Sequence, residues 1–305
     1  MSPRNADLPK PKRRHHKLPQ SFLKGFAAPL SYQHQKVPDI WVYRKECELI
    51  EGRNPELMSV KDTGYETDFY AFETQDGITD FQKYEDMLMK DFENPALPVL
   101  AKIRNLEDIG ADEKRTFARY TGSMITRGDW WRRVGEKALT DAIEQVSDKY
   151  FNTIPGGPAK EQIRKIIDGR ASALRKGEIF NQGVIRKAND VAVILEQMMW
   201  RFVVAPANMF FVTGDKPIVY WRLLDDDSEV IFPISTQVML SISWYANLNP
   251  SIQLKRRGTS QYYDADDKIV EHVRELICSG AFREIYHARR IEWLARFVQK
   301  RSSPE

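Results

Sequence analysis

The spacing of apolar residues changes from a helical to a strand period along the chain, and this change indicates the fold class. After Thr79, which can cap a helix, Phe81, Leu88 and Phe92 fall on one helical face. Further helical patterns cover 112–133, 135–150, 160–175, 185–202, 264–279 and 282–298. Strand patterns cover 40–43, 68–72, 209–213, 218–222, 229–232 and 238–244. We therefore expect an α+β fold, mostly helical, with a small antiparallel sheet.

The composition fits one globular domain and excludes several classes of protein. Of the 305 residues 42% are hydrophobic and 29% charged, as in folded domains. Residues 1–12, with prolines among charges, predict a disordered basic arm, and 13–305 a single α+β domain. Two cysteines without CxxC spacing argue against a disulfide scaffold. Because no signal peptide or apolar stretch long enough for a membrane is visible, we expect a cytoplasmic protein without membrane contact.

Basic residues gather at three places, although the total charge is nearly balanced. The 46 Lys and Arg residues face 43 Asp and Glu, so the total does not indicate nucleic acid. The clusters lie in 1–24, in 160–187 and at Lys255-Arg256-Arg257. These clusters are either solvated helix faces and a basic tail, or a surface that binds along the phosphate backbone of a nucleic acid.

The segment His15-His16-Lys17-Leu18-Pro19-Gln20 has the most distinctive set of side chains. Two adjacent histidines cannot share one face of a helix or strand, so a metal would be bound through a loop or by one of them. Pro19 favours an extended Leu18. Histidine serves as a metal ligand or as a general acid or base near neutral pH. The alternative is a basic linker whose histidines are solvated.

Two acidic residues, Glu85 and Asp215, lie next to apolar residues in the sequence pattern. Glu85 projects near the centre of an apolar helical face, where a charge requires a partner, a raised pKa or a function. Arg127 lies at the edge of another apolar stripe, so a structural Glu85–Arg127 ion pair is one prediction. Asp215 follows an apolar strand in Thr213-Gly214-Asp215-Lys216-Pro217. It is either a functional loop carboxylate or part of an ordinary β-turn.

These segments together resemble a bacterial family, the domain of unknown function 4238. Residues 14–26 are similar to its HHxxPQ-F-L-x-x-F opening, 40–43 to its first strand, and 66–70 to its Glu-x-x-Phe-Tyr segment. Glu85 and Glu93 resemble its helical acidic pair, and 213–217 its Thr-Ser-Asp-x-Pro turn, with Gly214 where Ser is usual. Lys17-Leu18 stands where Tyr-Val is common. The resemblance spans 12–290 and implies roles for five residues: His15, His16, Gln20, Glu66 and Asp215. It supplies no reaction.

The first hypothesis is a metal-dependent phosphodiesterase or nuclease acting on nucleic acid. Glu66 and Asp215, with one histidine and with Glu85 as a further carboxylate, would hold Mg²⁺ or Mn²⁺. His16 by preference would act as general base, with His15 and Gln20 beside it. Lys24 or Arg127 would neutralise charge on the phosphate. On this hypothesis His16→Ala abolishes turnover and leaves the melting temperature nearly unchanged.

The alternative hypothesis is a regulatory module that binds nucleic acid or a protein without chemistry. The HHxxPQ segment would then be structural and would tie the N-terminal arm across the sheet by hydrogen bonds. The basic clusters would bind nucleic acid or an acidic partner, with a steep salt dependence and no product.

Overall fold

The computed structural model describes residues 13–28, 37–45, 54–73, 78–128, 178–221, 228–244, 254–258 and 260–300, with 141, 161, 162 and 165. The predicted arm 1–12 lies outside these residues. The predicted helices 135–150 and 160–175 also lie outside them, apart from the four single positions.

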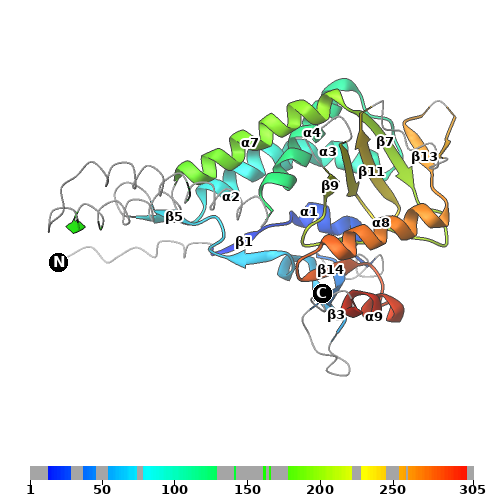
Figure 1. Ribbon diagram of the computed structural model, residues 1–305, viewed down its shortest axis with the longest axis horizontal. Coiled ribbons are helices and arrows are strands. Elements are labelled where there is room, and N and C mark those ends of the chain that lie inside the picture. Colours follow the sequence, from blue (N-terminus) through cyan, green and yellow to red (C-terminus); the bar gives the residue numbers. More distant parts are fainter. Residues whose placement is uncertain are drawn as a thin grey trace.

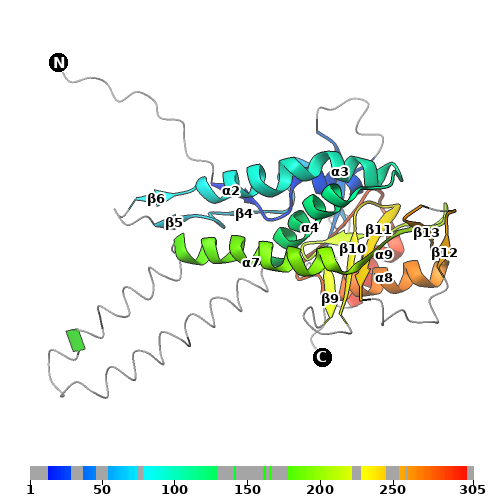
Figure 2. The same ribbon diagram turned by 90° about the horizontal axis from the view of Figure 1, so that it is seen from above.

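The largest sheet is mixed and six-stranded, and it lies on the right-hand side of Figures 1 and 2. Its strands, in spatial order, are β12 (Lys255–Arg256), β13 (Tyr262–Asp264), β7 (Met199–Val204), β11 (Val238–Ser243), β10 (Glu229–Pro233) and β9 (Val219–Trp221). Strand β13 runs parallel to β7, and the other pairs are antiparallel. Every residue of β11 is buried, which shows that both faces of the sheet are covered.

Helices cover the two faces of this sheet. On one face lie α3 (Asn94–Arg104), α4 (Ala111–Thr126) and α7 (Glu178–Gln197), where Phe117 stacks on Phe232 of β10. On the other face lies α8 (Asp267–Gly280), in one apolar cluster with Val203 of β7. Phe202, the neighbour of Val203, instead belongs to the apolar cluster under α3, α4 and α7. Neighbouring residues of β7 therefore point to opposite faces of the sheet.

Helices α4 and α7 pack closely because α4 has a glycine at the crossing. A Cβ atom on Gly122 would lie 2.3 Å from the carbonyl oxygen of Ala188 in α7. Nothing lies within 4 Å of the corresponding position on Gly183, elsewhere in α7. The absence of a side chain at residue 122 therefore sets the distance between the two helices.

A second, four-stranded antiparallel sheet joins distant parts of the chain. Its order is β3 (Glu56–Ser59), β2 (Asp39–Arg44), β14 (Glu284–His287) and β8 (Thr213–Gly214), with α9 (Glu292–Lys300) beside β2. Two small ribbons pair β1 (Arg14–His16) with β4 (Tyr65–Thr67), and β5 (Phe72–Glu73) with β6 (Thr79–Asp80). The short helix α1 (Gln20–Leu23) follows β1, with a 3₁₀ turn at Lys24–Phe26. Helix α2 (Lys83–Leu88) continues through a π-helical segment, Met89–Glu93, into α3.

The prediction of a mostly helical fold with a small sheet is wrong, because the fold is a mixed α+β structure with sheets of six, four, two and two strands. Strand β7 lay at the end of the predicted helix 185–202, and its burial on both faces removed the alternation that would have identified it. Strand β14 lay inside the predicted helix 282–298. The predicted strand 68–72 is mostly a turn, with Asp68 at φ 58°. Within the part of the chain that the structure describes, no helix is long and apolar enough to cross a membrane.

Buried His287 predicts a pH dependence of stability. Its Nδ1 accepts the backbone N–H of Arg289 at 3.1 Å, and burial lowers the pKa of His287 to about 4. The unfolded chain binds this proton below about pH 6.5, whereas the folded protein does not, so stability falls as the pH decreases from about 6.5 toward 4. The slope from this one proton is at most about 1.4 kcal/mol per pH unit.

Urea unfolding at pH 7, 6 and 5 measures this effect as a difference between variants. His287→Gln should reduce the loss of stability below pH 6.5, because the glutamine does not titrate. His272→Gln is the control, since His272 is exposed on α8 and should leave the slope as it is. Equal pH dependence in wild type and His287→Gln would contradict the assignment.

Candidate functional site

Strand β1 directs its two histidines to opposite sides. Its partner is β4, and His15 lies opposite Glu66 in the register. Successive side chains of a strand alternate between faces, so His15 and His16 do not share a site. His15 is fully buried and His16 is half-buried.

The hydrogen bonds of His15 determine where its proton lies. The backbone N–H of Tyr70 donates to Nδ1 of His15 at 2.9 Å. In the neutral ring the proton is therefore on Nε2, which makes Nε2 a donor. This atom is buried and has no acceptor among the described residues.

Arg127, at the end of α4, is the second buried polar residue of this region. Its Nη1 donates to Oε1 of Glu93 at 2.7 Å, and its side chain is only 2% exposed. Burial is the largest single effect and opposes the positive charge, but Glu93, Tyr70 and Tyr120 together outweigh it, and the pKa of Arg127 is raised. The Nε–H of Arg127 is also buried, with no acceptor in the described part of the chain.

Two tyrosines lie close to the same ion pair. The charges of Arg127 and Glu93 act on the hydroxyls of both Tyr70 and Tyr120. Burial raises the pKa of Tyr70 to about 12 and that of Tyr120 further, so both hydroxyls keep their protons at neutral pH. Neither hydroxyl finds an acceptor for its proton among the described residues.

These four groups form what we call the donor cluster: His15 Nε2–H, Tyr70 O–H, Tyr120 O–H and Arg127 Nε–H. All four can donate, and within the described structure none has an acceptor. A buried donor without an acceptor costs about 1–3 kcal/mol of stability, so folded proteins contain few of them. Several such donors near one guanidinium are typical of a site whose acceptors come from a ligand.

Glu93, rather than the predicted Glu85, pairs with Arg127. The prediction projected Glu85 on a regular α-helix from residue 79, but α2 begins at Lys83 and widens into the π-helical segment that ends at Glu93. A π-helical turn contains an extra residue and rotates the residues after it relative to a regular helix. Glu85 instead lies beside β1, where its Oε1 accepts the backbone N–H of His16 at 3.4 Å.

His16 and Gln20 connect β1 to α1. The side-chain nitrogen of Gln20 lies 3.0 Å from Nε2 of His16, where the amide donates and the ring accepts. Pro19 precedes α1, and its carbonyl oxygen accepts the N–H groups of Phe22 and Leu23. This side of β1 therefore fixes the path of the chain, and it is separate from the donor cluster.

Arg127 is one of the residues that line a narrow pocket. The pocket is lined by cationic, acidic and aromatic side chains, among them Lys17, Asp215, Lys216, Tyr220 and Phe282. Its volume is about 20 Å³, which is enough for a group the size of one water molecule. Three cations and one carboxylate line it, and two of these cations have carboxylate partners outside the lining, Glu66 for Lys17 and Glu93 for Arg127. Arg127 belongs to both the pocket lining and the donor cluster, whereas His15, Tyr70 and Tyr120 do not line the pocket.

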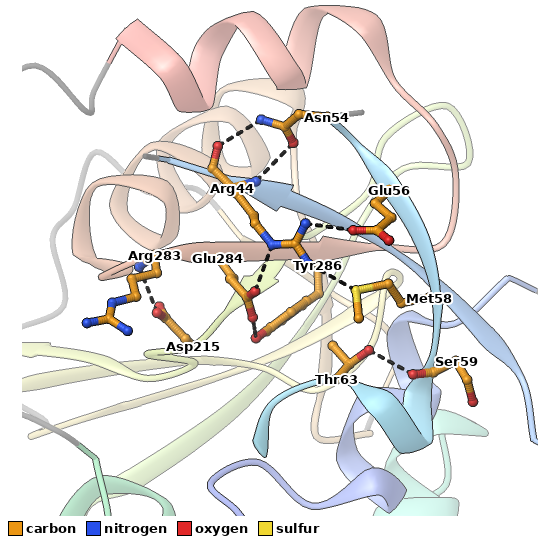
Figure 3. A network of polar contacts seen from close by, with 10 residues as sticks. All are labelled: Arg44, Asn54, Glu56, Met58, Ser59, Thr63, Asp215, Arg283, Glu284 and Tyr286. Atoms are coloured by element: carbon orange, nitrogen blue, oxygen red, sulfur yellow. Dashed lines mark hydrogen bonds and ion pairs between the residues drawn. The ribbon is translucent and has the colours of Figure 1, made fainter. Parts of the chain in front are cut away.

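Asp215 lines this pocket and also holds strand β14 in place. Its Oδ1 accepts the N–H of Phe282 at 2.8 Å and its Oδ2 that of Arg283 at 2.7 Å. Burial raises the pKa of Asp215, against the opposing effect of these two amides. Figure 3 shows Asp215 beside a network in which Arg44 donates to Glu56 and Glu284. The turn thus has a structural function, whatever else Asp215 does.

Asp215→Asn is expected to lower the free energy of unfolding by about 1–3 kcal/mol, because the new NH₂ group cannot accept from one of the two amides. Chemical denaturation measures the loss. Asp62→Asn is the control, since Asp62 forms only an exposed ion pair with Arg14 and should change stability by less than about 1 kcal/mol. An unchanged stability in Asp215→Asn would show that the two amide bonds contribute little.

The predicted metal ligands are held by other partners. Nζ of Lys17 lies 3.1 Å from Oε2 of Glu66, so Glu66 is already paired with a cation. Asp215 accepts two backbone N–H groups, and the charge of Lys17 opposes the rise of its pKa caused by burial. Glu85 is bonded to β1 instead. No group of three or more His, Cys, Asp or Glu side chains that could hold a metal occurs among the described residues. Lys24 is exposed and is not part of the pocket lining.

Tyr70 and Tyr120 were not predicted as site residues. Tyr120 falls on the apolar stripe of α4, where an aromatic residue predicts core packing, and Tyr70 lies in a segment with a strand pattern. Only the structure reveals that their hydroxyls are buried without acceptors.

Comparison with known proteins identifies a family and no reaction. A family model described as a protein of unknown function, DUF4238, matches residues 14–290. No curated protein and no solved structure matches the chain. Since the match covers most of the chain, including β1, the π-helical segment and the Asp215 turn, the protein belongs to the DUF4238 family.

Proposed function

We propose that this protein is a phosphodiesterase that binds a phosphate group of a nucleic acid at the donor cluster. The observation that carries the proposal is the set of four buried donors near Arg127, with no acceptor among the described residues. A phosphate group has several acceptor oxygens and a negative charge, which match a guanidinium and neutral O–H and N–H donors.

The pocket supports a route for the anion. Lys17 and Lys216 line it together with Arg127, and an entering phosphate would exchange their carboxylate partners for its own oxygens. Burial lowers the pKa of Lys216, while neighbouring Asp215 opposes this effect. With its present volume of about 20 Å³ the pocket admits a single oxygen-sized group, so the phosphate would displace the lysine side chains at entry.

His15 is a residue we assign to hydrogen bonding of the phosphate. Its Nδ1 accepts the Tyr70 amide, which holds the ring in the neutral tautomer, so its Nε2–H donates a hydrogen bond to a phosphate oxygen and keeps its proton. In the proposed step a water molecule attacks the phosphorus, the bond to the leaving oxygen breaks, and that oxygen takes up a proton from solvent. Arg127 and the two tyrosine hydroxyls would stabilise negative charge on the phosphate oxygens as it develops. His16, which the sequence favoured as the base, lies on the other side of β1, and we assign it to positioning.

No step of this proposal uses a metal, because Glu66 is paired with Lys17 and Asp215 accepts the N–H groups of Phe282 and Arg283. A role for Mg²⁺ or Mn²⁺ stays a prediction. Cleavage assays on single- and double-stranded DNA and RNA, each with Mg²⁺, Mn²⁺ or EDTA, test it together with the reaction. Products that disappear only in EDTA would support a bound cation.

Tyr120→Phe and Tyr70→Phe are the variants that test the site. Each removes one buried hydroxyl that lacks an acceptor, so the melting temperature should stay the same or rise, while turnover falls at least about tenfold. Tyr262→Phe is the matched control, because its hydroxyl donates to the carbonyl oxygen of Glu107 at 2.8 Å. That variant should lose about 1 kcal/mol of stability and keep its activity. Lower stability with full activity in Tyr120→Phe would refute the proposal.

A second function, binding without chemistry, is favoured by one observation: His16, Gln20 and Glu85 serve as structural links between β1, α1 and α2. The same variants distinguish it. Three results together would support it: nucleic acid binds, Tyr120→Phe weakens this binding, and no products form under any condition. The donor cluster would then be an anion-binding site of a regulatory module.

A further inference from the structure

A second hollow lies between α8, α9 and the segment that precedes β8. It has a volume of about 430 Å³ and shares no lining residue with the pocket at Arg127. We call it the α8–α9 groove, and its lining consists of Asn208, Met209, Phe210, Glu271, Arg274, Glu275, Trp293 and Phe297.

An exposed tryptophan forms one wall of this groove. Trp293 is 46% exposed, and it is the single aromatic residue among the large exposed hydrophobic residues of the described structure. Its ring stacks toward Phe210, with centroids 6.1 Å apart, and lies edge-on to Phe297. Tryptophan and arginine are enriched where protein interfaces have their strongest contacts.

The charges that the groove presents to solvent are negative. The guanidinium of Arg274 is layered against Phe210 at 4.1 Å and Trp293 at 5.2 Å, and its Nε donates to the carbonyl oxygen of Phe210. Arg274 is thereby buried, whereas Glu271 and Glu275 are exposed one helical turn apart. Outside the groove lining, Asp267 and Lys268 on α8 and Arg296 on α9 are exposed as well.

We infer that the α8–α9 groove binds an arginine or lysine side chain of a protein partner. An exposed tryptophan face beside carboxylates fits a cation, which gains both a cation–π contact and an ion pair. Arg274 already contacts the Trp293 ring from within the protein, so an incoming cation would contact the part of Trp293 that is exposed to solvent. The carboxylates repel phosphates, so nucleic acid is the less suitable occupant. The inference does not depend on the proposed phosphodiesterase activity.

Titration of the full chain with a short peptide tests the inference. The probe is acetyl-Arg-Ala-Arg amide, and its counterpart with citrulline in place of both arginines keeps the shape but removes the charge. The readout is the indole N–H signal of Trp293 in an NMR spectrum, assigned from its absence in Trp293→Ala. We expect saturable binding with a dissociation constant on the order of 1 mM or below, and at least tenfold weaker binding of the citrulline peptide.

A double variant, Glu271→Gln with Glu275→Gln, should bind the arginine peptide at least tenfold more weakly. The fold should stay intact, because both residues are exposed. Asp112→Asn is the control, since it removes an exposed carboxylate at the start of α4 and should change nothing. Equal binding of the citrulline peptide, no shift of the Trp293 signal, or tighter binding of an oligonucleotide at Trp293 would each overturn the inference.

Discussion

Lysine in place of Arg127 should reduce phosphodiester cleavage at least about a hundredfold while the protein stays folded. Lysine keeps the positive charge next to Glu93, so the ion pair at 2.7 Å can be replaced by a similar one. It lacks the planar guanidinium, however, and the Nε–H that belongs to the donor cluster is lost. Removal of a preorganised donor from a buried site has an effect of this size when the donor stabilises charge in the transition state.

The measurement is kcat/KM for the nucleic acid that the wild type cleaves, together with the melting temperature. Arg115→Lys is the matched control, because Arg115 lies on the same helix and forms only exposed ion pairs with Asp112 and Glu196. Its activity should stay within about twofold of wild type. Full activity in Arg127→Lys would mean that charge alone is needed at this position, and the donor geometry would lose its assigned role.

Alanine in place of Gly122 should lower the free energy of unfolding by about 3 kcal/mol. The new methyl group would lie 2.3 Å from the carbonyl oxygen of Ala188 and 3.3 Å from the backbone nitrogen of Ala192. Both atoms are backbone of α7, so neither can rotate away, and the helices must move apart. Because Arg127 follows on the same helix, this movement should also disturb the donor cluster.

Gly183→Ala supplies the matched control for this prediction. Residue 183 lies in the same helix pair, but nothing is within 4 Å of an added Cβ, and alanine favours helix over glycine by about 0.5–1 kcal/mol. The control should therefore be neutral or slightly stabilising. Urea denaturation of the two variants gives the comparison, and equal stabilities would show that α4 and α7 adjust without cost.

Local patterns predicted several elements because their own residues determine them. The strand at 40–43 and those at 218–222, 229–232 and 238–244 are present as β2, β9, β10 and β11, and the helix at 264–279 as α8. Strand β7 directly follows α7, and its residues, MWRFVV, show no regular alternation of apolar and polar side chains, so the helical pattern was extended into it. Strand β14 pairs with residues more than 60 positions away, so no local pattern specifies it.

The candidate site was also predicted only in part, because local residue types indicated it but tertiary contacts complete it. The residue types in His15-His16 indicated a site, and strand alternation explains why only His15 reaches the donor cluster. Arg127 was predicted, but its partner changed because the π-helical segment alters the helical register at Glu93. Whether a buried tyrosine hydroxyl has an acceptor depends on tertiary packing, which a single sequence does not contain.

The position of β14 between β2 and β8 has a consequence for the order of synthesis. This strand is made after β2 and β8, yet it is the link between them in the four-stranded sheet, and the two residues before it, Phe282 and Arg283, carry the amides that hold Asp215. While the ribosome is still translating residues before 282, β2 and β8 have no common neighbour and the pocket wall at Asp215 is incomplete. The candidate site should therefore assemble only after β14 has been made, however early its other residues are translated.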